Sequence, residues 1–513
     1  MLWIAVHLPQ LSLETFAATL EPGLRDRPLA LIETHRITHA DARAAALGIQ
    51  PGLKRATALA LAADLLLGQA DAVRDAQALQ AVAFAALAFT PSVCIESTAG
   101  AGVPAHVVLL EVEACLRYFG GFRKLLERLR EVLRPLGHRL QIASAPAARG
   151  AALLARWRDD LACGAHSHDP AASRALLDDA PVWLLGPGRE HWEALQGMGL
   201  HRLADLRHLP RAGLARRFGV DLLADLDRAR GDAPDPRQPI IWPPAFDQRI
   251  ELFSRADSVE QLLAGARVLL ARLLAWAGVR HARVARFTLA MHHEARQRIQ
   301  SHSLLEIALA EPSAELAHLL ALLSEHLGRL PLSAPALELS LRCDALVHAA
   351  PPNAQLFPTR GAEREGLVRL VERLQARLGR EGVRRIALVA DHRPERAAAW
   401  VPAEAAVPTP ALASALPAMV QPGVAGTLAR PLWLLREPLA LREQASRPWL
   451  DGAALQLLAG PERIESGWWD GALASRDYFI ALAADGALVW IYRARLPLQA
   501  IDGGGWFLQG RFA

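Results

Sequence analysis

The sequence has few cysteines and lysines, and no long apolar run that is free of charge. The four cysteines, Cys94, Cys115, Cys163 and Cys343, lie far apart and form no Cys-x-x-Cys pair. This spacing argues against a zinc site or a disulfide framework, and it fits a reducing, cytoplasmic location. Without 18 consecutive uncharged apolar residues, we expect no membrane span. The N-terminus also has no basic segment typical of a signal peptide.

Lysine is nearly absent, because Lys54 and Lys124 are the only two lysines and the other basic residues are arginines. Arginine suits bidentate phosphate contacts, although a GC-rich genome explains the same bias. The chain has 513 residues, 52% of them hydrophobic and 21% charged, with a formal net charge of +4. These values are typical of an ordinary globular protein with several domains.

Hydrophobic periodicity and turn residues predict an α+β multidomain fold. Residues 1–170 mix short strands, such as 29–33 and 107–112, with helices, such as 56–67 and 122–133. Residues 175–235 are expected to be helical and to end in a proline-rich linker.

A further α+β unit is expected at 246–350, where a capping box from Ser258 to Gln261 opens a helix. Residues 351–425 then combine a linker, a helix and an alanine- and proline-rich loop. Strands and turns fill residues 426–513, with a hairpin turn at Asp485-Gly486.

The opening run, Leu2-Trp3-Ile4-Ala5-Val6-His7-Leu8-Pro9-Gln10-Leu11, followed by Glu14, resembles the start of Y-family translesion DNA polymerases. In that family, this buried strand carries two aspartates, and the positions here hold Ala5 and His7. The family's second motif is Asp-Glu. His106 and Val107 take its place if Glu111 occupies the position of the later family aspartate. Mg²⁺ needs hard oxygen ligands, so the resemblance implies a polymerase scaffold without a catalytic metal or cofactor.

At two more positions the residue differs from the one that the family uses to bind the nucleotide. Ala45 replaces an arginine that contacts the incoming triphosphate, and Gln10 replaces the aromatic residue that screens the sugar 2′-OH. We therefore expect no enzyme activity. The alternative is an active polymerase with displaced carboxylates, drawn from Glu14, Glu96, Glu111 and Glu113. For His7 and His106 there are two alternatives. They are core or surface histidines whose hydrogen-bonding needs are met, or they belong to a repurposed zinc site.

Two segments resemble the family's DNA-binding parts. Gly197-Met198-Gly199-Leu200-His201-Arg202-Leu203 resembles a helix-hairpin-helix, whose glycines let backbone N–H groups approach a phosphate, although a plain helix turn fits as well. The unit at 246–350 resembles the little finger. Its arginines are expected to make salt-sensitive, sequence-independent phosphate contacts, or to form a solvated face. They are Arg267, Arg272, Arg280, Arg283, Arg286, Arg296 and Arg298, of which we favour Arg283 and Arg286.

The linker segment Asn353-Ala354-Gln355-Leu356-Phe357 resembles a bacterial sliding-clamp-binding peptide. An extended linker can place the two apolar anchors, Leu356 and Phe357, in a preformed groove next to Gln355. The alternative is that both side chains pack on their own domain.

The tail resembles the ImuB family, which are catalytically inactive Y-family (UmuC-like) homologues of bacterial mutagenesis cassettes. The motifs that carry this resemblance are Ala390-Asp391-His392-Arg393-Pro394-Glu395, Arg430-Pro431-Leu432-Trp433-Leu434-Leu435, Gly460-Pro461-Glu462-Arg463-Ile464-Glu465-Ser466-Gly467-Trp468-Trp469-Asp470-Gly471, Arg476-Asp477-Tyr478-Phe479 and Gly505-Trp506-Phe507-Leu508-Gln509-Gly510. Trp468, Trp469 and Trp506 are either core residues or anchors for a partner.

The resemblance implies an adaptor in SOS-induced, error-prone translesion synthesis and DNA repair. Its expected partners are DNA, the sliding clamp, an ImuA-type RecA-like protein and an error-prone C-family polymerase. A plain DNA-binding module, whose tail only stabilises the core, is a second alternative.

Overall fold

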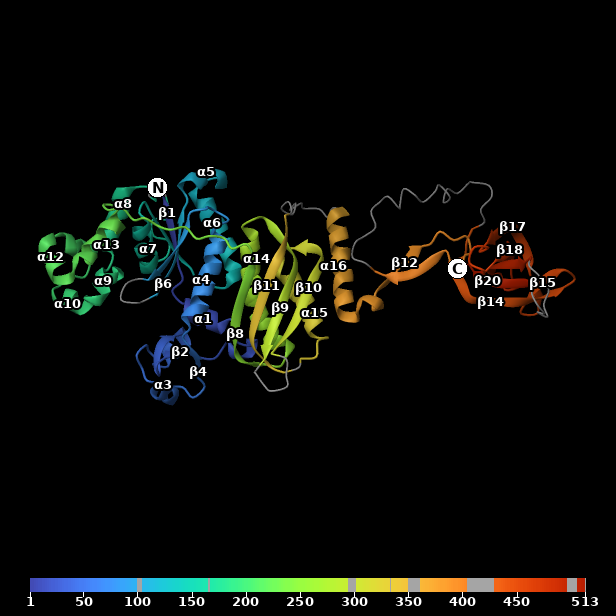
Figure 1. The fold of residues 1–513 in the computed structure, drawn as a ribbon, viewed down its shortest axis with the longest axis horizontal. Coiled ribbons are helices and arrows are strands. Elements are labelled where there is room, and N and C mark those ends of the chain that lie inside the picture. The colour runs from blue at the N-terminus through green and yellow to red at the C-terminus, as the bar shows by residue number, and fades with distance from the viewer. Residues whose placement is uncertain are drawn as a thin grey trace. The chain divides into compact units, whose positions relative to one another are not determined.

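The computed structural model describes residues 1–98, 104–164, 167–293, 301–332, 334–348, 360–403, 429–495 and 505–512. The chain divides into two compact units, Met1–Arg373 and Leu374–Ala513. Helices and strands alternate in the first unit, and strands dominate the second (Figure 1). The predicted α+β multidomain class is confirmed.

The part of residues 1–170 that the resemblance identifies with the family's palm, called the palm below, is built on an antiparallel sheet with the strand order β5-β6-β1-β7. Its strands are β1 (Trp3–His7), β5 (Val93–Thr98), β6 (Pro104–Glu111) and β7 (Gln141–Ala145). Because neighbouring residues of a strand point to opposite faces, each strand contributes to two cores. One face packs on α4 (Ala72–Ala86) and α6 (Phe122–Leu133), and the other packs on α7 (Ala148–Trp157). Shorter palm helices are α1 (Leu11–Ala17), η2 (Glu113–Cys115), α5 (Leu116–Phe119) and η3 (Arg134–Leu136).

The fingers form a small unit between β1 and α4, with the strand order β3-β2-β4. Its elements are η1 (Pro22–Leu24), β2 (Leu29–Glu33), β3 (Arg36–Ala40), α2 (Ala42–Ala46), α3 (Arg55–Leu61) and β4 (Leu66–Gln69). The predicted helix at 56–67 is wrong in its second half, because β4 pairs in parallel with β2. Gly68 on β4 leaves room for the ring of Phe16, which would lie 2.5 Å from a Cβ at this position.

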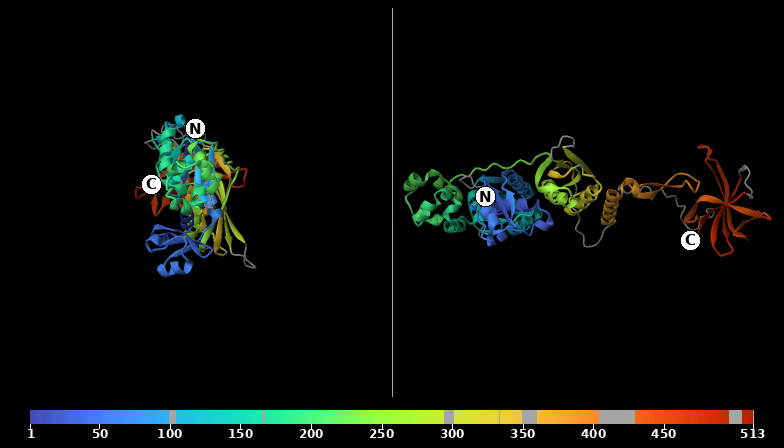
Figure 2. Two further views of the ribbon diagram at one scale, coloured as in Figure 1. Left: turned by 90° about the vertical axis from the view of Figure 1, so that its left-hand side faces the viewer. Right: turned by 90° about the horizontal axis from the view of Figure 1, so that it is seen from below.

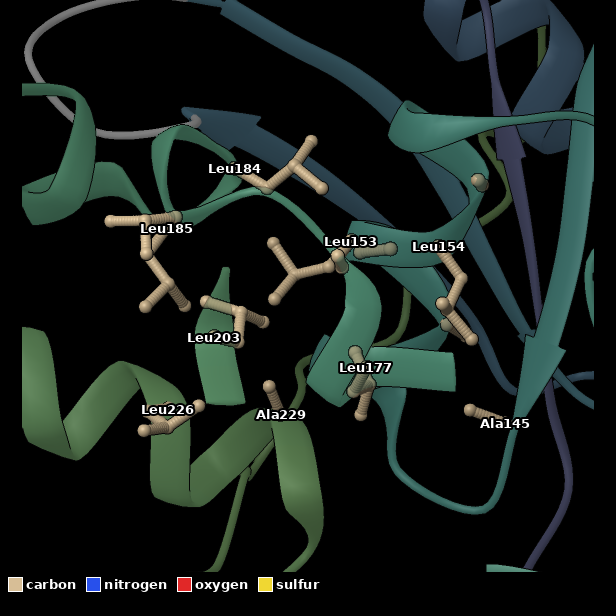
Figure 3. Close-up of a cluster of buried hydrophobic side chains, with 14 of the residues drawn as sticks. Ala145, Leu153, Leu154, Leu177, Leu184, Leu185, Leu203, Leu226 and Ala229 are labelled. Carbon is tan, nitrogen blue, oxygen red and sulfur yellow. The ribbon is translucent and has the colours of Figure 1, made fainter. Parts of the chain in front are cut away.

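The thumb is helical, as expected. It comprises α8 (Pro170–Asp179), η4 (Val182–Leu184), α9 (Gly186–Glu190), α10 (Trp192–Gly197), α11 (Leu203–Arg207), α12 (Arg211–Phe218) and α13 (Val220–Arg230). Leu153 of α7 points into a leucine cluster that includes Leu203 and Leu226 of the thumb (Figure 3). The approach of α13 to α7 is close, since a Cβ at Gly150 would lie 2.4 Å from the carbonyl oxygen of Ala229.

The little finger has the element order βαββαβ and the strand order β10-β9-β11-β8. Its elements are β8 (Phe246–Ala256), α14 (Val259–Gly278), β9 (Ala282–His293), β10 (His302–Ser313), α15 (Leu316–Leu327) and β11 (Ala336–His348). The predicted capping box at Ser258 opens α14. By length and composition α14 is apolar enough to cross a membrane, but it packs between the sheet and α4 of the palm. Helix α16 (Arg360–Leu378) follows.

In the second unit, a seven-stranded sheet follows a two-stranded hairpin (Figure 2). The hairpin elements are η5 (Arg380–Gly382), β12 (Arg384–Leu388) and β13 (Ala398–Pro402). The sheet comprises β14 (Trp433–Gln444), β15 (Arg447–Leu450), β16 (Ala453–Ala454), β17 (Gln456–Ser466), β18 (Ala474–Leu482), β19 (Leu488–Ala494) and β20 (Trp506–Arg511). Strands β14–β16 and β17–β20 form two antiparallel meanders, and the pairing of the last strand, β20, with the first, β14, joins them into one sheet. The predicted turn at Asp485-Gly486 joins β18 to β19, and Gly486 has φ +84°.

A buried arginine joins the hairpin loop to this sheet. The Arg393 guanidinium donates to Asp391 at 2.6 Å, to Asp470 at 2.7 Å and to the Ala472 carbonyl at 3.0 Å. Hydrogen bonding to these carboxylates raises the pKa of Arg393 and lowers that of Asp470. Residues 391–396 and 429–495 therefore belong to one folded body, although 25 residues of sequence separate Ala403 from Ala429.

Candidate functional site

Two of the positions at which the resemblance implies metal ligands, Ala5 and Val107, are apolar and fully buried. Ala5 and Val107 have 0% exposure and face α7 within one continuous hydrophobic cluster. In the strand pairing, Val107 lies opposite His7, and Ala5 lies opposite Leu109. Small side chains line this face, so α7 packs directly on the sheet. Neither residue supplies an oxygen ligand, and the donor set at these positions does not fit Mg²⁺.

The two histidines beside these positions are held neutral by partial burial. Burial lowers the pKa of His7 to about 4, while a 3.0 Å hydrogen bond to Gln141 partly opposes this shift. Burial also lowers the pKa of His106. His106 has φ +47°, and its carbonyl accepts a 3.0 Å hydrogen bond from Leu8 at the end of the β1–β6 pairing. Within the described part of the chain, no three His, Cys, Asp or Glu residues are grouped to hold a metal.

The carboxylates of the displaced-site alternative are engaged by different groups. Glu14 accepts from the Arg139 amide at 3.0 Å and lies 3.2 Å from His138. Glu111 accepts from the Leu2 amide at 3.4 Å, and Glu113 pairs with the N-terminal ammonium group. Glu96 belongs to a separate buried network. Within the described ranges, the four carboxylates do not form one site.

That buried network connects the palm, the thumb and the linker, and sequence reasoning missed it. Arg149 at the start of α7 pairs with Glu96 of β5 and, at 2.6 Å, with Asp225 of α13. Arg237 of the linker reaches Glu96 at 3.3 Å and Asp235 at 2.8 Å. Although burial lowers the pKa of Arg149, the charges of Glu96 and Asp225 raise it above its ordinary value. The network therefore ties the thumb to the palm through charged groups that are removed from water.

Ala45 and Gln10 are the residues for which the resemblance implies contacts to the triphosphate and the sugar. Gln10 precedes α1 and does not cap it, and Ala45 lies on α2 with its side chain exposed. Arg43, on the same helix, pairs with Asp26 at 2.9 Å.

The backbone N–H groups of the thumb hairpin donate to acceptors within the hairpin itself. The amides of Met198, Gly199 and Leu200 bond to helix carbonyls, and those of His201 and Arg202 both donate to Asp205 at 2.8 Å. These backbone hydrogen bonds lower the pKa of Asp205.

Gly199 has φ +77°, which provides the turn, whereas Gly197 ends α10. The Arg202 side chain pairs with Asp179 at 2.9 Å. The hairpin is thus closed by internal acceptors, which favours the plain-turn alternative over the phosphate contact.

The open face of the little-finger sheet carries both signs of charge. Arg286 pairs with Glu306 at 3.4 Å, Arg249 pairs with Glu338 at 3.3 Å, and Arg283 is half-buried on β9. Carboxylates are therefore as prominent on this face as arginines, which weakens its attraction for phosphate.

Other arginines of the predicted set lie elsewhere. Arg272 is buried and donates to Gln248 at 3.4 Å, so it has no phosphate to reach, and burial lowers its pKa to about 10. Arg280 stacks over Trp242 with its guanidinium carbon 4.0 Å from the ring centre, and Arg267 is exposed. Arg296 and Arg298 lie outside the described residues, as do the clamp-peptide residues Gln355, Leu356 and Phe357.

The three tryptophans predicted to bind a partner lie in different environments. Trp468 and Trp469 are 72% and 57% exposed and pack edge to face in the turn after β17. Arg393 lies over Trp469 at 5.6 Å and fixes the adjacent Asp470. Trp506 is only 4% exposed and packs in the sheet core, so its ring is not available to a partner.

The order of the units in the first 348 residues is palm, fingers, thumb and βαββαβ little finger, with the fingers inserted in the palm. The resemblance to Y-family polymerases that the sequence motifs carry implies this same order of units. The chain is similar to Protein ImuB of Caulobacter vibrioides strain NA1000 / CB15N, at 28% identity over 490 residues. The match covers 91% of this chain and 100% of that protein.

The same protein from strain ATCC 19089 / CIP 103742 / CB 15 matches equally, so the predicted resemblance to ImuB is confirmed. Among solved structures, similarity extends to a DinB family error-prone DNA polymerase from Sulfolobus solfataricus. It has 14% identity and a TM-score of 0.38, and the match covers 68% of this chain and 100% of that one. An insertion ternary complex of Dbh DNA polymerase has 14% identity and a TM-score of 0.37, with the same coverage. No family model matches the chain.

Proposed function

We propose that this chain is a non-catalytic polymerase scaffold that acts as an adaptor in error-prone translesion DNA synthesis. In this role it holds DNA and joins the sliding clamp, a RecA-like accessory protein and a C-family polymerase that performs the chemistry. The observation that carries the proposal is the filled palm face. Ala5 and Val107, at two of the ligand positions that the resemblance implies, have 0% exposure and pack against α7.

A polymerase needs oxygen ligands on this face to hold Mg²⁺ at the primer end. The two partly buried histidines do not replace them, because neutral imidazole prefers zinc or copper and the nearest histidine, His7, already bonds to Gln141. The carboxylates elsewhere in the palm are committed to the amide of Arg139, the N-terminal amine and the Arg149 network.

The adaptor half of the proposal is supported by two candidate anchor sites. The linker peptide ending in Leu356-Phe357 has the composition of a clamp-binding motif. Trp468 and Trp469 stand in solvent on a turn that the Arg393 network holds in place. Rigid exposed aromatic residues favour association, because little side-chain entropy remains to be lost on binding.

Primer extension with the purified full chain tests the catalytic half. We expect no nucleotide addition with Mg²⁺ or Mn²⁺ on a primed template that supports extension by an active Y-family enzyme. Robust extension that disappears on Glu111→Ala would refute the proposal in favour of the displaced-carboxylate alternative.

A pull-down with purified sliding clamp tests the adaptor half. Binding should be lost when Leu356→Ala and Phe357→Ala are combined. It should be retained by Trp433→Ser, a matched change of an exposed apolar residue elsewhere. If clamp binding is absent in the unmodified chain, or unaffected by the double change, the clamp role is withdrawn.

A further inference from the structure

The hairpin of β12 and β13 presents an exposed apolar face. Ile386 lies directly opposite Trp400, and Leu388 shares their side of the hairpin. The exposed fractions of these side chains are 59% for Ile386, 67% for Trp400 and 73% for Leu388. The alternating residues on the other side, such as Ala387 and Val401, are half-buried. The large apolar side chains of this hairpin thus point to solvent, which is the reverse of ordinary burial.

Both ends of the hairpin are nevertheless fixed. At its base, the Ala403 amide donates to the Val383 carbonyl at 2.8 Å, and the Gln375 side chain donates to the Ala403 carbonyl. At its tip, Arg393 is held by Asp470, and Glu395 pairs with Arg476 at 2.9 Å. Two strands alone are marginally stable in water, so these anchors keep the apolar face displayed in a defined shape.

The charges around this face are mainly positive. Arg384 lies on the same side as Ile386, is half exposed and approaches Glu381 only at 3.9 Å, a distance at which a surface pair contributes little. Arg377 is exposed on the adjoining helix, whereas Arg396 at the tip of the hairpin is paired with Asp470; residues 374–403 together carry six arginines against three acidic residues. Charge complementarity therefore selects a partner that carries carboxylates beside apolar side chains.

We propose that the face formed by Ile386, Leu388 and Trp400 is a docking site for an acidic, apolar segment of a partner protein. A single-stranded nucleic acid is less suited, because a stacking platform uses several aromatic rings, and this face has one ring with two aliphatic side chains. This proposal is independent of the proposed lack of polymerase activity, because a catalytically active chain could present the same docking face.

The test uses the full chain and three labelled probes in fluorescence anisotropy titrations. The probes are a short peptide that alternates glutamate with leucine, the same peptide with lysine in place of glutamate, and an oligothymidylate. We expect the acidic peptide to bind most tightly. Its affinity should fall by at least about tenfold in the Ile386→Ser, Trp400→Ser double variant, because both central anchors are lost. A smaller loss of about threefold is expected for Arg384→Glu.

Trp433→Ser is the matched control, because Trp433 is also exposed, at 71%, on a strand of the same unit. It should leave acidic-peptide binding unchanged. Equal binding of the lysine peptide, or affinity that is unaffected in the double variant, overturns the proposal. Tighter binding of oligothymidylate that is lost in the double variant assigns the face to nucleic acid instead. Sedimentation velocity tests whether the face binds a second copy of the chain. If the unmodified chain is a dimer and the double variant is a monomer, the face is a dimer interface and the proposal is overturned. Melting curves that match the unmodified chain confirm that each variant is folded.

Discussion

Replacing Ala5 with aspartate introduces the carboxylate that the resemblance to Y-family polymerases implies for this position, so this variant distinguishes an apolar, filled palm face from a dormant metal site. Ala5 is fully buried between β6 and β7, opposite Leu109 and Ala143, and beneath α7. Its neighbours on this face are apolar, so a carboxylate there gains no hydrogen bond.

Burial of this kind raises the pKa of a carboxyl by about 3–5 units. At about 1.36 kcal/mol per unit, the Ala5→Asp variant should lose about 4 kcal/mol of unfolding free energy at pH 7, because the cost accumulates only from the unfolded pKa of about 3.9 up to pH 7. This cost equals much of the stability of a typical domain. Because the folded-state pKa lies above the unfolded value, the electrostatic cost is absent below about pH 4 and grows as pH rises toward the folded pKa.

The assay is guanidinium unfolding of the variant and the unmodified chain between pH 4 and pH 7.5, with and without Mg²⁺. Ala5→Asn is the matched control, because it adds similar volume without a charge and should cost the same at every pH. A loss of unfolding free energy below about 1 kcal/mol at pH 7 would refute the reasoning, because burying an unpaired charge costs more than this. Restoration of stability by Mg²⁺ would refute it as well, because it would reveal a metal site.

Three further outcomes are expected. Arg149→Met should lower the unfolding free energy by about 3–5 kcal/mol in denaturant titrations, because two buried carboxylates lose their partner, and neutralising both should recover most of the loss. The His7 pKa of about 4 lies below its unfolded value of 6.5, so His7 favours folding above pH 6.5, and this contribution is lost as pH falls to 4. Relative to His7→Gln, the unmodified chain should therefore lose up to about 3 kcal/mol across this window, and equal pH profiles would contradict the assignment. Glu306→Gln frees Arg286 and should strengthen duplex binding at low salt, with the slope of log K against log salt steepening by about one, as filter binding can measure.

Local patterns predicted many elements of the fold. The capping box at Ser258 correctly marked the start of α14, and Asp485-Gly486 correctly marked a hairpin turn. The helix expected at 56–67 is wrong from Leu66 onward, where β4 begins. This strand forms because it pairs in parallel with β2, which lies more than thirty residues earlier in the chain. Such pairing depends on tertiary contacts that override local propensity.

The candidate site was less accessible to sequence reasoning. The apolar character of Ala5 and Val107 could be read directly from the sequence, and the structure shows that both are buried; their correspondence to ligand positions stays a prediction from the resemblance. The Arg149 network could not be read from the sequence, because its carboxylates lie 53 and 76 residues away along the chain. Trp506 alternates with Phe507 on β20, but composition alone did not reveal that both sides of this strand are buried.

The insertion of Arg393 into the C-terminal sheet has a practical consequence for mapping partners with truncated chains. A fragment that begins at residue 426, where the sequence suggests a boundary, would leave Asp470 without its buried guanidinium. It would also expose the surface that Glu395 covers beside Arg476 and Gln509. Loss of binding by such a fragment would then report damage to the fold, whereas a fragment that starts at Leu374 keeps the domain whole. A chain cleaved by a protease between 404 and 428 should likewise remain associated as one particle.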